Sequence, residues 1–485
     1  MKKIIPLVMI ICLLLPSCQL KKAQITNNPV TFPETATVSE TSGFYTDSTQ
    51  SLTASELESS AEASSSLVTS VATVLSSTTF SAVRTTKSTT TPSTKKPTVT
   101  TTKPTTAKTT VSATQPQASE NGLRGIWISC YDHINAKDKT RAQYKAETDK
   151  MFKNIKEHGL NTAFIHLRAF SDAFYESDIY PYSAYIAGKE GASLPFDPFE
   201  VMLESAQKYD VSVHGWINPF RVSTKSDISL LSSKNPAKKI IDSGNENGEI
   251  CILSNGIYYN PSCPENHGRI IDGVREINSK YDIDGIHIDD YFYPSTDEKV
   301  DKIQYSQYKT DGGTLSLPEW RKANVNAFVS ALYSAVKAHD SSLIVSISPS
   351  AKLEENESKI YADVGLWLSR KGYADLIIPQ IYFGFEHETL GFEKLLKQWG
   401  TLPRSSSVKL ACGIAAYKCG VADNYAGTGK KEWQQNSDIL ARQVKSIQNN
   451  SNYSGFVIFS YQDLIRSECR TEMDNFKDTV KTGNS

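Results

Sequence analysis

The stretch Tyr281-Asp-Ile-Asp-Gly-Ile-His-Ile-Asp-Asp-Tyr-Phe-Tyr-Pro294 has the pattern of a short buried strand that ends in acidic residues. Ile286 and Ile288 alternate in it with small or polar residues, and a proline closes the stretch. Because successive side chains of a strand point to opposite faces, the two isoleucines share one face, while His287 and Asp289 share the other. In a closed barrel the first face would pack on helices. His287 and Asp289 would then point inward at the mouth formed by the strand C-termini, where such barrels carry out chemistry.

Two interpretations of these polar residues stay open at this point. Asp289 or Asp290 could cap the next turn, and His287 could be a core histidine with satisfied hydrogen bonds, because acidic residues are common at turns. The functional interpretation rests on the three aromatic residues that follow directly, beginning at Tyr291. Ring faces beside carboxylates suit a sugar ring better than a phosphate or a nucleic-acid backbone.

Outward from this stretch, predicted strands and helices alternate along the chain. Buried strand patterns occur at residues 123–129, 162–167, 211–217, 285–289, 343–348, 376–380, 410–414 and 455–459. Helical periodicity and capping signals lie between them, at residues 141–157, 198–208, 266–280, 319–339, 361–370, 390–399 and 437–447. Eight strands alternating with helices predict an α/β fold, a (β/α)8 TIM barrel, and residues 121–485 are a natural length for one decorated barrel.

The N-terminal residues 1–18 have the pattern of a secretory signal. Two lysines precede an apolar run from Ile4 to Leu15 that is too short for a stable membrane span, and Leu-Pro-Ser-Cys18 follows. This end resembles a bacterial lipobox, in which the cysteine becomes the lipidated first residue of the mature protein. An uncleaved membrane anchor is the alternative. Either way we expect the rest of the chain to lie outside the cytoplasm, with Cys18 anchoring it to the bacterial cell membrane.

Residues 19–120 are rich in Ser, Thr, Pro and Lys and contain few large apolar side chains. Such a segment cannot bury enough surface to offset its ordering entropy, so we expect a disordered tether. A flexible chain of about 100 residues has a typical end-to-end distance of roughly 55 Å. The formal net charge of −1 gives no indication of a polyanionic partner, and nucleic acid is not expected to bind.

The cysteines leave their pairing open. Once Cys12 leaves with the signal and Cys18 carries lipid, six remain, at positions 130, 251, 263, 412, 419 and 469. An exported protein could pair them in any of 15 connectivities or keep them as free thiols. Their spacings fit no zinc motif.

Polar and aromatic side chains recur at the C-terminal ends of six predicted strands, which is where a barrel binds its ligands. The expected substrate-binding residues are His166, Arg168, His214, Trp216, Asn218, Arg221, His287, Tyr291, Gln380 and Tyr382. Each residue alone could have a purely structural role, because polar side chains can satisfy buried hydrogen bonds in any core. Their recurrence at one end of the barrel favours a site. The longest loops, at about residues 218–265 and 290–317, would wall a cleft for an extended substrate.

Several motifs together resemble one known family. They are Leu123-Arg-Gly-Ile-Trp, Asn161-Thr-Ala-Phe, His214-Gly-Trp-Ile-Asn-Pro-Phe-Arg221, Tyr259-Asn-Pro261, the stretch 284–294, Trp320-Arg-Lys-Ala-Asn-Val325, Pro379-Gln-Ile-Tyr382 and Gly455-Phe-Val-Ile-Phe-Ser460. In this order, over about residues 122–475, they resemble the glycosyl hydrolase-like 10 family. The resemblance implies an exported (β/α)8 glycoside hydrolase, often a lipoprotein, with some members associated with peptidoglycan glycan.

Glycoside hydrolysis needs two carboxyl groups, about 5 Å apart for retention or about 6.5–9.5 Å apart for inversion. Asp289 is the first candidate, as nucleophile or base, with His287 resembling the lysine of the Lys-x-Asp arrangement in some retaining barrel glycosidases. For the partner acid we favour Glu386, on the loop after the sixth strand, over the adjacent Asp290. Glu354, Glu355 and Glu357 are third choices.

These expectations describe a surface-anchored glycoside hydrolase that cleaves a cell-wall or environmental polysaccharide, with peptidoglycan glycan among the candidates, and that uses no metal or other cofactor. Two other classes stay open. The paired aspartates resemble the strand end of a metal-dependent carbohydrate deacetylase, although no two of the eight histidines lie three to five residues apart. A tethered glycan-binding lipoprotein without a working carboxylate pair is the second.

Overall fold

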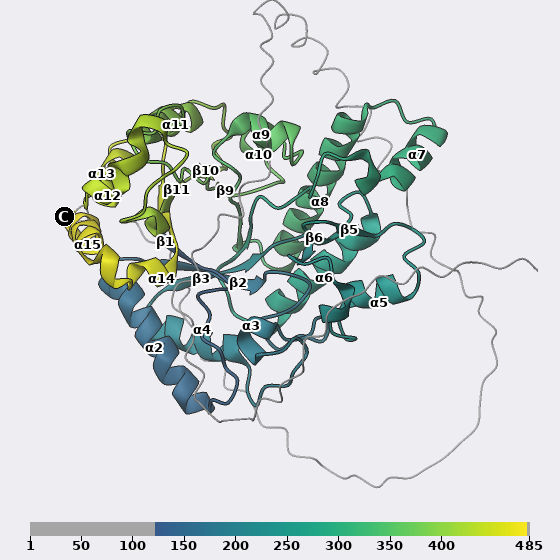
Figure 1. The fold of residues 1–485 in the computed structure, drawn as a ribbon, viewed down its shortest axis with the longest axis horizontal. Helices are drawn as coiled ribbons and strands as arrows, with labels where there is room; N and C mark the ends of the chain where they lie inside the picture. The colour runs from purple at the N-terminus through teal and green to yellow at the C-terminus, as the bar shows by residue number, and fades with distance from the viewer. Residues whose placement is uncertain (1–121, 483–485) are drawn as a thin grey trace, which may run out of the picture. The chain divides into compact units, whose positions relative to one another are not determined.

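The computed structural model describes residues 122–482, which form a barrel of strands surrounded by helices (Figure 1). The expected signal at residues 1–18, with Cys18, and the expected tether at residues 19–120 lie outside the described residues. Within residues 122–482 no helix has the length and apolar character needed to cross a membrane.

The barrel of the described residues has eight strand positions, and neighbouring strands pair in parallel. The strands are β1 (Leu123–Ile128), β2 (Thr162–Arg168), β3 (Ser212–Ile217), β7 (Gly285–Ile288), β8 (Ile344–Ile347), β9 (Leu376–Ile377), β10 (Lys409–Leu410), β11 (Cys412–Ala415) and β12 (Gly455–Phe459). β10 and β11 share one position, because only Ala411 separates them, and β10 pairs with β9 while β11 pairs with β12. Since β12 also pairs with β1, the sheet closes and the predicted (β/α)8 barrel is confirmed.

Eight of the described helices lie around the strands (Figure 1). They are α2 (Arg141–Glu157), α4 (Pro198–Lys208), α6 (Pro264–Lys280), α8 (Leu317–His339), α10 (Val364–Ser369), α11 (Phe392–Gly400), α13 (Ile439–Gln448) and α15 (Arg470–Thr482). Helices α2 and α8 begin at capping boxes, Thr140 with Gln143 and Ser316 with Glu319, in which side chain and backbone satisfy each other's free groups. Helix α15 follows the last strand and has no counterpart among the predicted helices.

Shorter elements occupy the loops that follow the strand C-termini. They are α3 (Ala184–Ala187), β4 (Arg221–Ser223), η1 (Ile228–Leu230), α5 (Pro236–Asp242), β5 (Ile250–Leu253), β6 (Gly256–Tyr259), η2 (Glu298–Val300), α7 (Lys302–Thr310), α9 (Leu353–Ser358), η3 (Ala416–Lys418), η4 (Gly427–Lys431), α12 (Glu432–Gln435), α14 (Tyr461–Leu464) and η5 (Ser467–Cys469). Strands β4, β6 and β5 form an antiparallel sheet within residues 218–265. Both long loops expected from the sequence therefore contain folded elements of their own.

The buried apolar side chains form two clusters, one inside the barrel and one between the strands and the helices. The inner cluster consists of Trp127, Phe164, Trp216, Leu376, Ile378, Ala411 and Val457. Ile286 and Ile288 belong to the outer cluster, between strands and helices, and both are fully buried. Burial of one such side chain stabilises the fold by roughly 1.5–3 kcal/mol. The neighbouring His287 and Asp289 consequently point into the barrel.

The six cysteines within the described residues are free thiols, and all are buried. Burial raises the pKa of the Cys251 and Cys263 thiols to about 12. Both therefore remain protonated and poorly nucleophilic at neutral pH.

Candidate active site

Asp289 lies directly after β7, at the C-terminal mouth of the barrel, and is only 3% exposed. Its Oδ2 accepts a hydrogen bond of 3.0 Å from the indole Nε1 of Trp216 on the neighbouring strand β3. Its Oδ1 lies 3.5 Å from the backbone N–H of Tyr291. One carboxylate oxygen is thus held by β3, and the other faces the start of the loop that carries Tyr291.

The environment of Asp289 favours its neutral form. Burial, the largest cause, and repulsion from the adjacent Asp290 together raise the pKa of Asp289 to about 8. The hydrogen bond from Trp216 and the positive charge of Arg221 act in the opposite direction and lower this pKa. Burial also raises the pKa of Asp290, against a side-chain hydrogen bond from Gln380 and the charge of Arg221. Two carboxyl groups whose pKa values are shifted at the mouth of a barrel are candidates for acid–base chemistry.

Arg221 supplies the positive charge of this site. It is the first residue of β4, and its guanidinium carbon lies 4.4 Å from the centre of the Tyr291 ring and 5.3 Å from that of Phe170. Tyr291 itself is 42% exposed. The predicted residues Arg221, Tyr291, Gln380 and Asp290 therefore gather around Asp289, with one aromatic ring open to solvent.

His287 is fully buried below this group, and both of its ring nitrogens bind protein groups. Its Nε2 lies 3.1 Å from the indole Nε1 of Trp127 and 3.1 Å from Oγ of Ser348, and its Nδ1 lies 2.9 Å from Oγ of Ser346. Because an indole N–H can only donate, Nε2 must accept and Nδ1 must carry the proton. Burial lowers the pKa of His287 well below its ordinary value, so the ring is neutral. These contacts match the interpretation of His287 as a core histidine with satisfied hydrogen bonds.

His166 and His214 line the inside of the barrel at different depths, His166 against Trp216 and His214 below it, beside Gly285 at the start of β7. The His166 ring stacks on Trp216 with centroids 3.7 Å apart and planes at 7°. Its two nitrogens are buried without a hydrogen-bond partner among the described residues. Burial lowers the pKa of His166 well below its usual value and that of His214 to about 4, so both rings are neutral. A neutral imidazole has one donor and one acceptor nitrogen, so His166 can donate one hydrogen bond and accept one.

Arg168 and Asn218 shape the turn between β3 and β4. The buried Arg168 donates from Nη1 to the carbonyl oxygens of Asn218 and Pro219, at 2.7 and 2.9 Å. The Asn218 side chain in turn accepts the backbone N–H of Arg221 at 3.3 Å. In this structure the two residues hold the turn that places Arg221 over Tyr291.

Tyr382, after β9, belongs to an aromatic group inside the mouth. Its ring meets Trp127 edge-on at 6.3 Å and lies 5.9 Å from Phe459. Burial raises the pKa of its phenol well above the ordinary value, with Asp290 among the charges nearby. Tyr382 therefore forms the wall of the mouth on the side of β9 and β12.

Glu386 lies on the loop after β9. Its side chain is exposed, and its backbone N–H donates to the Glu432 carboxylate at 2.9 Å. Within residues 122–482 no hydrogen bond or ion pair joins the Glu386 carboxylate to Asp289 or Asp290. The third-choice glutamates sit in the loop after β8, where Glu355 pairs with Lys352 and Lys359 and Glu357 lies 3.9 Å from Lys322.

A buried ion pair that the sequence patterns did not reveal fixes the loop after Asp289. Arg321 of α8 binds Asp301 through Nε at 2.8 Å and Nη2 at 2.7 Å, and both side chains are fully buried. The same guanidinium donates to the carbonyl oxygens of Thr296 and Asp297 and to the Tyr361 hydroxyl. Arg321 lies in the motif 320–325, so its position was visible in the sequence, but its partner 20 residues earlier was not.

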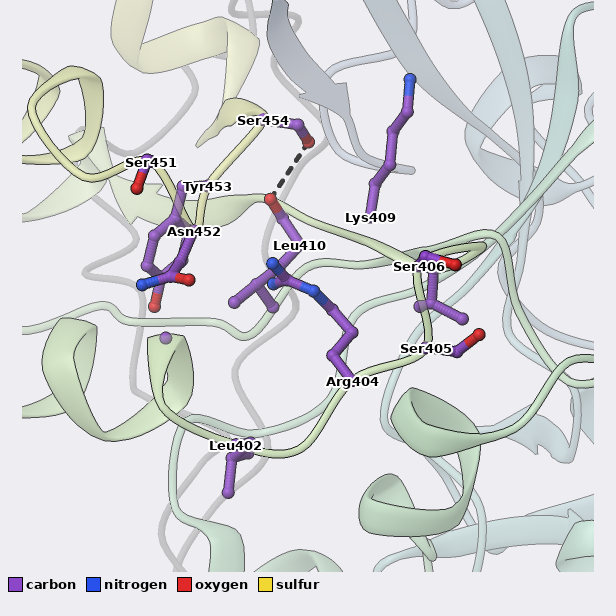
Figure 2. A pocket seen from close by; sticks show the side chains of 12 residues that line it. Leu402, Arg404, Ser405, Ser406, Lys409, Leu410, Ser451, Asn452, Tyr453 and Ser454 are labelled. Carbon is purple, nitrogen blue, oxygen red and sulfur yellow. Dashed lines mark hydrogen bonds between the residues drawn. The ribbon is translucent and has the colours of Figure 1, made fainter.

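A cavity of about 480 Å³ lies on the face of the barrel opposite the mouth, where the strands begin. Figure 2 shows the side chains that line it. It opens beside the starts of β10 and β12, with Arg404 and Lys409 in its lining and the Ser454 hydroxyl bonded to the Leu410 carbonyl at 3.0 Å. None of the described residues that line it is an Asp or a Glu. The cavity therefore has no carboxyl pair for catalysis, and the mouth, where Asp289 lies, is the better candidate for the active site.

A (β/α)8 barrel that carries a pair of carboxyl groups, one buried and one partly buried, and aromatic rings at its C-terminal mouth has the architecture of a glycosidase-type enzyme. The chain belongs to the glycosyl hydrolase-like 10 family, whose family model matches residues 122–433. The family resemblance seen in the sequence is thereby confirmed.

Two relatives and one solved structure illustrate the similarity. The chain is 29% identical to glycosyl hydrolase YngK of Bacillus subtilis (strain 168) over 368 residues, with 71% of this chain and 69% of YngK covered. It is 27% identical to glycosyl hydrolase DigH of Escherichia coli (strain K12) over 380 residues, with 71% of this chain and 84% of DigH covered. The glycoside hydrolase domain of PgaB (BpsB) from Bordetella bronchiseptica aligns with a TM-score of 0.49 and 12% identity, over 73% of this chain and 98% of that domain.

Proposed function

We propose that this protein hydrolyses glycosidic bonds in a cell-wall or environmental polysaccharide, and that peptidoglycan glycan is the first substrate to test. The observation that carries the proposal is the Asp289–Asp290 pair at the barrel mouth, where burial raises the pKa of both carboxyl groups, that of Asp289 to about 8. Exposed Tyr291 offers a ring face beside this pair. Membership of a glycosyl hydrolase-like family supports the same chemistry.

In this mechanism Asp289 donates the proton to the leaving glycosidic oxygen. One carboxyl group of a glycosidase must be protonated and the other ionised, and the raised pKa of Asp289 supplies the protonated one. Asp290 is less deeply buried, and Gln380 and Arg221 favour its charged form. We therefore assign to Asp290 the role of the ionised carboxylate, which assists the reaction at the anomeric carbon. The assignment gives Asp289 the donor role in place of the nucleophile or base role suggested by the sequence.

We further propose that the enzyme is a lipoprotein of the cell surface. The support is the sequence alone: the Leu-Pro-Ser-Cys18 segment would provide the lipid anchor, and residues 19–120 would hold the barrel away from the bilayer. A substrate outside the cytoplasm is consistent with both segments.

The deciding experiment incubates the purified protein with wall glycan, with and without stem peptides, and with other polysaccharides, and identifies products by mass spectrometry. Wild-type protein should generate new reducing ends, and Asp289→Asn should generate far fewer. Release of acetate without chain cleavage would favour a deacetylase, for which no group of three His, Cys, Asp or Glu suited to hold a metal occurs within residues 122–482. Tight binding of every glycan without cleavage by the wild type would favour a glycan-binding lipoprotein.

A further inference from the structure

Two exposed tyrosines stand on the loops that follow the adjacent strands β1 and β2. Tyr131 is 62% exposed and Tyr185, on α3, is 39% exposed. Their ring centroids are 5.4 Å apart and the rings are perpendicular. Exposed apolar side chains that are scattered singly are normal, whereas side chains that form a contiguous exposed patch, as these two rings do, are a known mark of binding sites.

The Tyr185 ring is held in place by packing before any ligand arrives. The Tyr185 ring stacks at 6.1 Å on Phe170 and at 6.5 Å on Phe174, both of which are buried. The Asn135 side chain donates to the Tyr185 carbonyl at 3.0 Å, so the loop after β1 is tied to α3. Such pre-ordering lowers the entropic cost of binding.

The loop that carries Tyr131 is fixed by its neighbour Asp132. Oδ2 of Asp132 accepts hydrogen bonds from the backbone and hydroxyl of Ser129, at 2.7 and 2.6 Å. Oδ1 accepts from the Ser460 hydroxyl at 3.1 Å and from the Gln462 backbone at 2.7 Å. The four bonds satisfy this buried carboxylate within the protein and leave the adjacent Tyr131 ring directed to solvent.

The pair is continuous with the candidate active site. Phe170, against which Tyr185 stacks, also contacts the guanidinium of Arg221 at 5.3 Å. Arg221 covers the Tyr291 ring at 4.4 Å, and Tyr291 adjoins the carboxyl pair. A chain of ring and cation contacts therefore runs along one side of the mouth from Tyr185 to Tyr291.

We propose that Tyr131 and Tyr185 form a second sugar-stacking subsite, which binds a pyranose unit of the same glycan chain farther along the mouth than the bond that is cleaved. The proposal rests on the proposed function. A pyranose with equatorial substituents presents a face of C–H groups, which packs on an aromatic ring, while its hydroxyls can reach the tyrosine hydroxyls at the edge. The subsite therefore favours long glycan strands, whose sugar units present uncharged C–H faces, over short strands.

The test uses full-length protein and wall glycan strands separated into long and short fractions. Tyr131→Ala and Tyr185→Ala should each lower the ratio of kcat/KM for long strands to that for short strands by about tenfold. Tyr185→Phe should restore most of the ratio, because it keeps the ring. Tyr209→Ala is the control, since Tyr209 lies at the end of α4, beside the start of β3 and therefore on the face opposite the mouth.

Binding is measured separately, by calorimetry with the long strands on an Asp289→Asn background, in which turnover is expected to be far slower. The affinity should fall about tenfold for the two alanine variants and stay unchanged for Tyr209→Ala. An unchanged ratio and an unchanged affinity would overturn the subsite. If wild-type protein cleaves no strand, the hydrolase proposal fails, while the affinity of the tyrosine variants still decides whether the subsite exists.

Discussion

Replacing Asp289 by Asn should stabilise the protein while it removes activity. The folded protein retains the Asp289 proton to about pH 8, whereas the unfolded chain releases it near pH 3.8. Between these values the folded state binds more protons than the unfolded state, so the contribution of Asp289 to stability falls as the pH rises. Each pH unit in that interval corresponds to about 1.4 kcal/mol, which gives a cost of roughly 4 kcal/mol at pH 7 and roughly 2 kcal/mol at pH 5.

Asparagine is always neutral and retains an oxygen for the Trp216 indole, so the variant avoids this cost. For a folded region of this size, about 4 kcal/mol corresponds to an increase in Tm of about 5 °C at pH 7, with a smaller increase at pH 5. Thermal unfolding followed by circular dichroism measures it, and Asp474→Asn on the exposed face of α15 is the control. The kcat should fall about 10²- to 10⁴-fold, as for loss of a proton donor, and wild-type kcat/KM should decline above about pH 8. A variant that is less stable than wild type at pH 7, or a difference independent of pH, would show that Asp289 is ionised in the folded protein.

Four further outcomes can be checked. Glu386→Gln should retain activity within a few fold, because that side chain is exposed; a loss as large as that of Asp289→Asn would restore it as the proton donor. Arg321→Met should destabilise the fold by about 3–5 kcal/mol in urea unfolding, since it leaves Asp301 buried without a partner, and a double variant that also changes Asp301 to Asn should recover part of this loss. Cys18→Ala should abolish incorporation of labelled lipid; unchanged labelling would contradict the anchor. Limited proteolysis should cut within residues 24–120 and leave an intact fragment of the barrel, and protection of that segment would refute its disorder.

The sequence predicted the features of this fold that depend on near neighbours. The alternation around Ile286 and Ile288 gave the correct inward face, because a period of two follows from strand geometry alone. The helical periodicity of residues 141–157 likewise gave the correct bounds of α2. The interruption of one strand at Ala411 was not predicted, because it depends on how two different neighbours pair on either side.

In the candidate active site, too, the features that depend on near neighbours in the sequence could be predicted, and those that depend on distant residues could not. That Asp289 ends a strand could be read locally, but its pKa depends on Trp216 and on burial by the whole mouth. The state of His287 depends on Trp127, which lies 160 residues earlier in the chain. No pattern of spacing carries such information, because the two residues meet only when the barrel closes.

The pairing of β1 with β12 has a practical consequence for engineering. The described chain enters at Leu123, the start of β1, and Val480 near its end packs beside Gly159, just before β2 begins. Both ends thus reach the face opposite the mouth, so a fused reporter, a surface-display anchor or a solid support attached at either end would leave the entrance for a polymer unobstructed. The proximity of the two ends also makes the barrel suitable for circular permutation, with a new opening placed in an outer loop.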